Sequence, residues 1–229
     1  MHPAVGIIFD MDGVLVDSGN AHRQAWQQLG REIGTPFTDE LFQRTFGRRN
    51  ASIIPIWLGR GSHELTVQRV DALAERKETL YRDLVRQGAV RIYSGAATLL
   101  ARLRRLGASV AVASSGPREN VSLLIDTLGV RAAIDAAVSS EDVTEGKPDP
   151  QVFLTAAERL GIEPTRCGVI EDSVHGIEAA RRAHMLAVAV LTSTAEAALT
   201  AAGADLVVDE IGSIDAQELV RRVADRTGR

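Results

Sequence analysis

Residues 7–18 read IIFDMDGVLVDS, and this stretch decides the fold. The apolar run Val5–Phe9 is typical of a buried strand, and two carboxylates, Asp10 and Asp12, follow it directly. Turn chemistry is one explanation, because Asp and Gly favour turns at strand ends. However, alternate side chains of an extended chain point to one side, so two carboxylates there are costly unless a cation lies between them or one keeps its proton. The stretch therefore raises two hypotheses, a turn or a catalytic site.

The composition is that of an ordinary globular protein. Hydrophobic residues make up 45% of the 229 residues and charged residues 24%. The net charge of −4 gives no indication of a nucleic acid or an anionic membrane as partner, and no apolar run approaches the roughly 18 residues of a membrane span. The single cysteine, Cys167, excludes an intrachain disulfide, and the early first strand leaves no room for a signal peptide. We therefore expect a cytoplasmic protein, and we expect a monomer.

Short apolar runs alternate with helical patterns over most of the chain. The predicted strands are Val5–Phe9, Ser109–Ala113, Ala136–Val138, Gly168–Ile170, Leu186–Val190 and Asp205–Val208. The predicted helices between them are Ala96–Leu106, Glu119–Leu128, Pro150–Leu160, Val174–Ala183 and Thr194–Ala202. Such alternation predicts an α/β fold with a doubly wound, Rossmann-like parallel sheet that helices cover on both faces.

One stretch, from about Asn20 to Gln87, breaks this alternation. It contains helical patterns only, which we place at Ala21–Ile33, Asp39–Phe46, Ser52–Leu58 and near Glu64–Arg86. We therefore expect two domains, since domain boundaries favour exposed loops. Residues 1–18 and 90–229 form the core, and residues 19–89 form a small α-helical domain inserted into it.

Polar side chains follow several predicted strands, at the edge of a parallel sheet where ligands bind. They include Asp10 and Asp12 after the first strand, and Glu171 and Asp172 after the fourth; the others are Ser114, Ser115 and Lys147. Carboxylates with room for water suit Mg²⁺, and a lysine and a hydroxyl facing them suit a phosphoryl group, whose charge must be offset on several sides. The histidines and the cysteine show no zinc spacing, and no strand is followed by a dinucleotide-binding or P-loop glycine pattern.

The paired aspartates then have different tasks in phosphoryl transfer. One carboxylate remains ionised and attacks phosphorus, which gives an aspartyl-phosphate, and the other holds a proton for the leaving oxygen. Phosphate-monoester hydrolysis is so slow without a catalyst that enzymes supply up to about 10²¹-fold acceleration. Covalent catalysis, proton transfer and charge neutralisation together meet that demand.

Four stretches, in this order, give a specific resemblance. FDMDGVLVDS, AVASSG, GKPDP and VIEDSVHGIEAA each stand after the appropriate predicted strand. In these motifs the chain resembles the haloacid dehalogenase superfamily. Its helical insert resembles the small cap domain of the subfamily that contains beta-phosphoglucomutase and many sugar-phosphate phosphatases.

The resemblance implies a role for each core residue. Asp10 would be the nucleophile and a magnesium ligand, and Asp12 would be the general acid and then the base, with its backbone carbonyl on magnesium. The phosphate-binding residues would be Ser114, Ser115 and Lys147, and the magnesium set would be Asp10, Asp12, Glu171 and Asp172. The cofactor that the resemblance implies is Mg²⁺.

The insert matches the mutase only in part. His22 and Lys77 stand where the mutase has the same residue types, and the resemblance makes them, with Arg49 and Asn50, candidates for substrate binding. The cap Gly-x-x-Arg of the mutase is here Gly47-Arg48-Arg49-Asn50, with an arginine one residue early. The mutase has Lys-Asn after the serine of its second motif, and this chain has Pro117-Arg118 in the corresponding stretch. Both changes affect the second phosphate site, which a mutase needs and a phosphatase does not.

Three functions remain open at the level of sequence. The leading hypothesis is a magnesium-dependent phosphatase for small phosphomonoesters, sugar phosphates above all, that acts through an aspartyl-phosphate. The second is a beta-phosphoglucomutase that interconverts glucose 1-phosphate and glucose 6-phosphate. The third is an inactive metabolite-binding protein on the same fold. In each case the expected partner is a small phosphorylated metabolite, with no nucleic acid and no membrane.

Overall fold

The computed structural model describes residues 4–59 and 65–226, which divide into two compact units. The core unit comprises Met1–Asp17 and Ile92–Arg229, and the insert unit comprises Ser18–Arg91.

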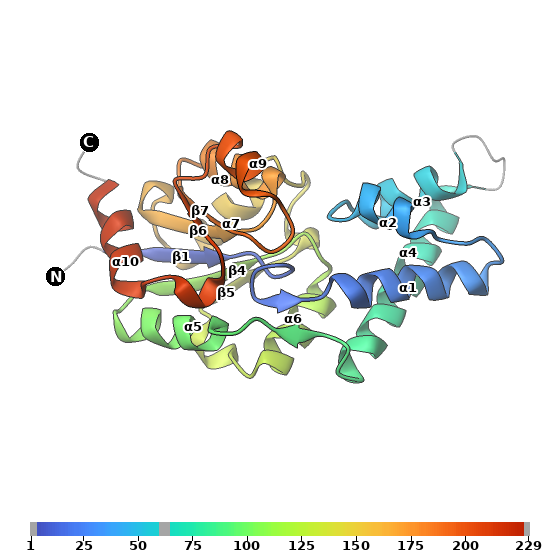
Figure 1. Cartoon of the computed structure of the whole chain (residues 1–229), viewed down its shortest axis with the longest axis horizontal. Coiled ribbons are helices and arrows are strands. Elements are labelled where there is room, and N and C mark those ends of the chain that lie inside the picture. Colours follow the sequence, from blue (N-terminus) through green and yellow to red (C-terminus); the bar gives the residue numbers. More distant parts are fainter. Residues whose placement is uncertain (1–3, 60–64, 227–229) are drawn as a thin grey trace. The chain divides into compact units, whose positions relative to one another are not determined.

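The core unit is built on a parallel sheet, which has six strands in the described part of the chain, in the order β5-β4-β1-β6-β7-β8 (Figure 1). The strands are β1 Gly6–Phe9, β4 Ser109–Ala113, β5 Ala136–Val138, β6 Cys167–Glu171, β7 Leu186–Val190 and β8 Leu206–Val208. The chain builds outward from β1 to β4 and β5 on one side, then returns to add β6, β7 and β8 on the other. This is the doubly wound arrangement, and the predicted α/β fold is confirmed.

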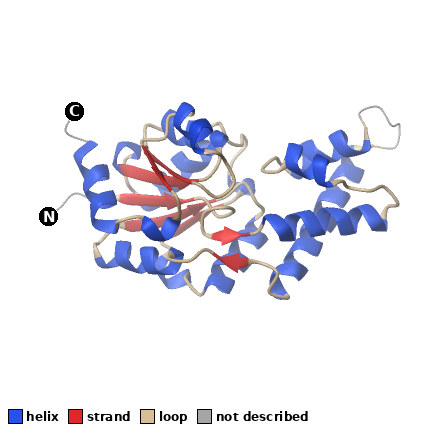
Figure 2. Cartoon of the chain, viewed as in Figure 1, coloured by secondary structure: helices blue, strands red, loops and turns tan. Residues whose placement is uncertain are grey.

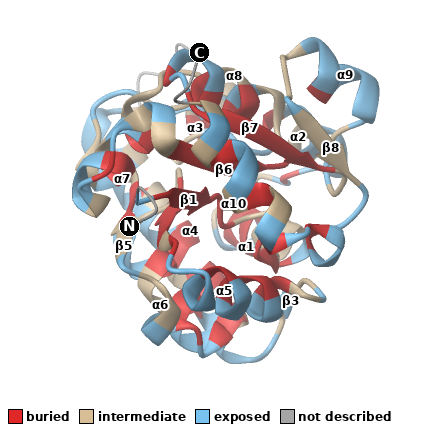
Figure 3. Ribbon diagram, turned by 90° about the vertical axis from the view of Figure 1, so that its left-hand side faces the viewer, coloured by how far each residue is buried: buried red, intermediate tan, exposed pale blue. Residues whose placement is uncertain are grey.

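Helices connect the strands of the core unit (Figure 2). They are α5 Ala96–Arg105, α6 Arg118–Leu128, α7 Gln151–Leu160, α8 Val174–Arg182, α9 Glu196–Ala201 and α10 Ala216–Asp225. Short 3₁₀ turns lie at η1 Arg131–Ala133, η2 Ser140–Asp142, η3 Pro164–Arg166 and η4 Ile211–Ser213. Because helices cover both faces, the central strands are apolar without alternation, and Figure 3 colours β1, β6 and β7 as buried.

Most of the predicted boundaries in the core agree with the structure to within one residue. The exception is α9, which begins at Glu196 and not at the predicted Thr194. The residue before it, Ala195, has an extended backbone (φ −66°, ψ 143°), so Thr192–Thr194 belong to the loop that follows β7. A pair of two-residue strands, β2 Val16–Asp17 and β3 Arg91–Ile92, was not predicted, because two residues are too few to show a strand period.

The described part of the insert unit consists of helices. They are α1 Gly19–Glu32, α2 Asp39–Thr45, α3 Asn50–Leu58 and α4 Val67–Arg86. The predicted start of the last helix, Glu64, lies outside the described residues. Thr38 and Thr66 cap α2 and α4 with their hydroxyls, and the stacked rings of Trp26 and Phe37, 4.9 Å apart, form part of the small apolar core. Trp26 is therefore a packing residue, as its sequence context favours.

No helix in residues 4–59 and 65–226 has both the length and the apolar surface that a bilayer crossing requires.

Candidate active site

The candidate site of the core unit lies where β1, β4 and β6 end. Phe9, the last residue of β1, is in register with Val112 of β4 and Ile170 of β6. The residues that follow therefore emerge at one edge of the sheet: Asp10 from β1, Ser114 from β4, and Glu171 and Asp172 from β6. Lys147 reaches the same edge from the loop before α7.

The ammonium group of Lys147 joins two of these strands. Its Nζ donates to Asp10 Oδ1 at 2.5 Å and to Glu171 Oε1 at 2.7 Å. The Lys147 side chain is only 8% exposed, and its Nζ lies 4.9 Å from the centre of the Phe153 ring. Lys147 is therefore not a solvated loop residue. The two carboxylates hold the pKa of Lys147 above its ordinary value against the effect of burial, so the group remains a cation.

The carboxylate of Glu171 has hydrogen bonds on both oxygens. Oε1 accepts from Lys147, while Oε2 accepts from the backbone N–H groups of Asp172 and Ser173, each at 2.7 Å, and from Ser173 Oγ at 2.9 Å. The group lies against the first turn of α8, where a Cβ on Gly176 would come within 1.9 Å of it. Burial alone would raise the pKa of Glu171, but the charge of Lys147 and these hydrogen bonds lower it. Glu171 is thus held as a carboxylate with hydrogen bonds on both oxygens.

Asp10 and Asp172 are in a different electrostatic state. Burial raises the pKa of Asp10 well above its usual range, and the charges of Glu171, Asp172 and Asp12 raise it further, against the opposing effect of Lys147. Burial and the charge of Glu171 raise the pKa of Asp172 to about 7. The buried carboxyl groups of Asp10, Glu171 and Asp172 thus outnumber the single ammonium group of Lys147, and a further cation bound beside them would favour their ionised forms.

Magnesium fits this donor set. In residues 4–59 and 65–226 no group of three or more His, Cys, Asp and Glu side chains is arranged to hold a metal ion. Mg²⁺ needs less, because it keeps several waters and binds through one or two carboxylates together with substrate phosphate. Asp10 and Asp172 supply two buried carboxylates of this kind, close enough that the charge of one raises the pKa of the other.

The loop after β1 brings its backbone against Asp172. Gly13 has a φ of +85°, and a Cβ at this position would lie 2.0 Å from Asp172 Oδ2. Glycine is thus required here both for the turn and for the approach of the carboxylate. Asp12 is partly exposed, and its backbone forms a bridge with Val16.

The two serines after β4 differ in burial. Ser114 is buried, and its Oγ accepts a hydrogen bond from Gly116 N at 3.0 Å, whereas Ser115 is partly exposed. The Gly116 bond is a turn interaction, and it uses an oxygen lone pair of Ser114 and not the hydroxyl proton.

Two hydroxyl residues of this site, in the loop after β7, were not predicted from the sequence. Thr192 Oγ1 donates to the carbonyl oxygen of Gly13 at 2.6 Å and lies 3.3 Å from Asp172 Oδ2. Ser193 Oγ donates to the backbone carbonyl of Asp172 at 3.3 Å. Both residues follow a strand of the same sheet, and this position could have indicated a place in the site. They also directly precede the helix that was predicted to begin at Thr194, which hid that indication.

The structure gathers a second set of predicted residues within the insert unit. Lys77 Nζ lies 2.7 Å from His22 Nδ1 and donates to Glu78 Oε1 at 2.8 Å, and Asn50 Nδ2 donates to the same oxygen at 2.6 Å. We call His22, Asn50, Lys77 and Glu78 the insert cluster. Lys77 is 2% exposed and Glu78 5%, so both charged groups are buried within the insert unit.

Aromatic rings line the insert cluster. The His22 ring stacks on Tyr81 with 3.9 Å between ring centres, and Lys77 Nζ lies 5.2 Å from the centre of the Tyr81 ring. Burial alone would raise the pKa of Glu78, but the charges of Lys77 and His22 and the hydrogen bonds lower it to about 2. Glu78 was not predicted. Arg49, the remaining predicted residue, is the N-cap residue of α3 and is partly exposed.

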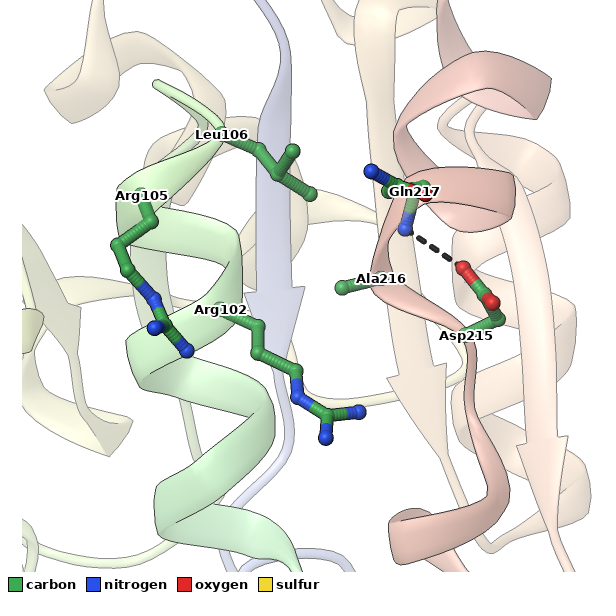
Figure 4. Close-up of a pocket in the computed structure, with 6 residues that line it drawn as sticks. All are labelled: Arg102, Arg105, Leu106, Asp215, Ala216 and Gln217. Atoms are coloured by element: carbon green, nitrogen blue, oxygen red, sulfur yellow. Dashed lines mark hydrogen bonds between the residues drawn. The ribbon is translucent and has the colours of Figure 1, made fainter.

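A cavity of about 330 Å³ lies elsewhere on the core unit, between the last turn of α5 and the first turn of α10 (Figure 4). Its lining consists of Arg102, Arg105, Leu106, Asp215, Ala216 and Gln217. None of these is a predicted site residue. Asp215 Oδ1 accepts from the N–H groups of Gln217 and Glu218, so the start of α10 is capped by its own chain.

Comparisons with known proteins agree on a family. A family model described as haloacid dehalogenase-like hydrolase matches residues 5–184. The chain is 31% identical over 211 residues to validoxylamine A 7'-phosphate phosphatase of Streptomyces hygroscopicus subsp. limoneus, covering 90% of this chain and 94% of that protein. It is 32% identical over 187 residues to the beta-phosphoglucomutase of Bacillus subtilis (strain 168), covering 80% and 82%. The chain spans 21% and 57% of two longer relatives from Arabidopsis thaliana.

A solved structure shows the same fold. The crystal structure of a beta-phosphoglucomutase from Clostridium difficile matches with a TM-score of 0.86 at 24% identity, covering 99% of this chain and 100% of that one. Together with the family model and the relatives above 30% identity, this likeness agrees with the motifs at the strand ends. The chain belongs to the haloacid dehalogenase-like hydrolase family, and it is an enzyme.

Proposed function

We propose that this enzyme is a phosphoric monoester hydrolase: a magnesium-dependent phosphatase for small phosphorylated metabolites, with sugar phosphates as the favoured class. The observation that carries the proposal is the buried ion-pair arrangement in which Lys147 bridges Asp10 and Glu171 beside Asp172. It combines a nucleophile, a fixed cation and excess negative charge for a metal at one sheet edge. Phosphoryl transfer through an aspartyl-phosphate uses all three of these features.

In the proposed reaction, a carboxylate oxygen of Asp10 attacks phosphorus. The bond from phosphorus to the leaving oxygen breaks, and Asp12 gives that oxygen its proton, so that a free alcohol and an aspartyl-phosphate result. Asp12, now a base, takes a proton from water, and the water oxygen attacks the phosphoryl group. This step releases inorganic phosphate, restores the carboxylate of Asp10 and returns the proton to Asp12.

Charge stabilisation in this scheme comes from named groups of the chain. Lys147 would hold a phosphoryl oxygen, and the Ser114 hydroxyl, whose proton is not used in its bond from Gly116, would donate to another, with Ser115 beside it. Asp10, Asp172 and the backbone carbonyl of Asp12 would hold Mg²⁺, which when bound supplies positive charge against the phosphoryl oxygens.

We assign Glu171 to the positioning of Lys147, and not to the metal as the sequence suggested. Both of its oxygens already accept hydrogen bonds, from Lys147 on one side and from the start of α8 on the other. A metal ion on Oε1 would lie beside the ammonium group of Lys147, which repels it, and a metal ion on Oε2 would compete with the backbone donors of Asp172 and Ser173.

Two contacts favour a phosphatase over a mutase. Lys77 and Asn50, which are candidates for a second phosphate site, both donate to the carboxylate of Glu78. Arg118, in the second stretch that departs from the mutase, pairs with Asp142 (Nη2 to Oδ1, 2.8 Å). The groups that a mutase would direct at a second phosphate are therefore bonded to carboxylates of their own unit. We propose that the insert cluster, with Arg49, instead contributes to the choice of the leaving alcohol.

The test is a panel of phosphomonoesters, sugar phosphates included, with measurement of released phosphate. We expect release that requires Mg²⁺ and stops on chelation. It should be absent in Asp10→Asn, whose thermal unfolding should stay close to wild type because Glu171 remains as a partner for Lys147. Conversion of glucose 1-phosphate to glucose 6-phosphate with a bisphosphate primer, without phosphate release, would contradict the proposal in favour of the mutase. Tight binding of a metabolite without any turnover would instead support a binding protein.

A further inference from the structure

The loop that follows β7 carries two hydroxyls to the candidate active site. Its backbone is fixed to the sheet, since Leu191 N donates to Val208 O of β8 and Thr192 N donates to Val190 O, both at 3.0 Å. Thr192 therefore leaves the sheet at a defined point, one strand away from β6 and its Asp172.

The Thr192 side chain contacts two separate segments of the site at once. Its Oγ1 donates to Gly13 O at 2.6 Å, in the loop that carries Asp10 and Asp12, and lies 3.3 Å from Asp172 Oδ2, which follows β6. Gly13 and Thr192 are 179 residues apart in the chain. Ser193 adds a contact of 3.3 Å to the backbone carbonyl of Asp172.

The two segments that Thr192 joins are already in direct contact. The Asp172 carboxylate lies against the bare Cα of Gly13, where any Cβ would come within 2.0 Å of Oδ2. Gly13 N also donates to Val16 O at 2.8 Å, which closes the loop on the other side. A change in the orientation of the Gly13 peptide would therefore displace the carboxylate of Asp172, and the hydroxyl of Thr192 opposes such a change.

We propose that Thr192 is a positioning residue, whose hydroxyl holds the Asp172 carboxylate in register with the Asp10–Gly13 loop and thereby sets the affinity of the site for Mg²⁺. The inference rests on the proposed function, because it takes Asp10 and Asp172 as the metal-binding carboxylates. Groups that hydrogen-bond to metal ligands fix the orientation of those ligands, and their loss typically weakens metal binding about 10–100-fold.

The experiment compares three variants of the full chain. Thr192→Val keeps the volume and removes the hydroxyl, and Thr192→Ser restores the hydroxyl. The matched control is Thr127→Val, since Thr127 Oγ1 likewise donates to a backbone carbonyl, Leu123 O at 2.8 Å, but in α6. Calorimetric titration with Mg²⁺ alone gives the affinity without reference to turnover. We expect about 10-fold weaker Mg²⁺ binding in Thr192→Val, and wild-type affinity in Thr192→Ser and Thr127→Val.

Kinetics separates positioning from general damage. In Thr192→Val the rate of phosphate release should recover as Mg²⁺ is raised, with an unchanged KM for the phosphomonoester at saturating Mg²⁺. Damage to the fold would not be reversed in this way. Should Thr192→Val fail to fold, Thr192→Ala removes the same hydroxyl. Its smaller side chain leaves space for a water that can donate to the Gly13 carbonyl, so this carbonyl keeps a hydrogen-bond partner.

The outcomes distinguish this inference from the proposed function. Equal Mg²⁺ affinity in wild type and in the variant that lacks the hydroxyl, with an active wild type, would overturn the role of Thr192 alone. A wild-type enzyme that neither binds Mg²⁺ nor releases phosphate from any ester would overturn the proposed function and this inference with it.

Discussion

At the scale of single residues, one ammonium group governs the charge of the candidate site. Lys147 contacts Asp10 and Glu171, while Asp172 and Asp12 add further negative charge nearby. The carboxylates therefore differ: hydrogen bonds on both oxygens fix Glu171, whereas the proposed function makes Asp10 the nucleophile and Asp172 a ligand of the metal. Substitutions at single positions separate these roles.

Asp12→Ala should slow both the formation and the breakdown of the aspartyl-phosphate, each by about 10²–10⁴-fold, because the proton transfer is lost in both steps. Rapid-quench measurement of the two half-reactions checks this prediction. Equal rates in wild type and variant would remove Asp12 from the scheme.

Lys147→Met should destabilise the fold as well as stop turnover. It leaves Glu171 and Asp10 buried without their cation, and the loss of one partner of a buried ion pair costs about 3–5 kcal/mol. Denaturant unfolding gives the free energy. The control is Arg86→Met, because Arg86 pairs with Asp83 on the exposed surface of α4, and its loss should change stability little. Equal stability losses in the two variants would contradict the prediction.

At the scale of elements, two helices are associated with a buried carboxylate. The first turn of α8 packs against Glu171, and α4 carries Glu78. Gly176 leaves space for Glu171 in α8, and α4 places Lys77 and Glu78 side by side inside the insert unit. Glu171 contacts both the start of α8 and Lys147, and Glu78 contacts both Lys77 of its own helix and Asn50 of α3.

Gly176→Ala should lower both stability and activity. The new Cβ would meet the Glu171 carboxylate at 1.9 Å, so the carboxylate and its bond to Lys147 must shift, and overpacking of this kind typically costs about 1–3 kcal/mol. The control is Gly19→Ala at the start of α1, where the nearest atom, Phe46 Cζ, lies at an ordinary 3.8 Å. Thermal unfolding and phosphate release of the two variants give the comparison.

The stability of the enzyme should fall in acid in a manner that depends on Glu78. Its pKa is about 2 in the fold, below the ordinary 4.5, so folding favours the carboxylate. The stabilisation is fully present above pH 4.5 and is lost as the pH falls toward 2; the shift corresponds to about 3 kcal/mol. Urea unfolding across this range should show the loss in wild type and a flatter profile in Glu78→Gln. Parallel profiles would contradict it.

At the scale of the whole molecule, much of the fold and part of the site could be predicted from the sequence. The apolar runs that became β1, β4 and β6 are continuous and short, and the residues after them are unusual for a core, so Asp10, Ser114 and Asp172 were expected at one edge. Glu78 and Thr192 were not expected in their clusters, because each makes contacts with segments far away in the sequence. The burial of Glu78 depends on how α1 and α3 pack on α4, and the contact of Thr192 joins loops 179 residues apart.

Removal of the metal should be visible in the stability of the entire chain. If Mg²⁺ binds the folded state only, a concentration 100 times Kd adds about 2.7 kcal/mol to the free energy of unfolding. We expect a rise in Tm with Mg²⁺, its reversal by a chelator, and a smaller rise in Asp172→Asn. A Tm that is indifferent to Mg²⁺ would count against the assigned donor set.

The central place of β1 has a consequence for synthesis on the ribosome. Its two neighbours are β4 and β6, so the first strand to be made has an uncovered second edge until Cys167–Glu171 has been made. A nascent or truncated chain that ends before Cys167 leaves one edge of the apolar strand β1 without its partner β6. The unpaired backbone groups of that edge can then pair with strands of other chains. Such fragments should aggregate, and assembly of the catalytic centre is among the last events in the formation of this enzyme.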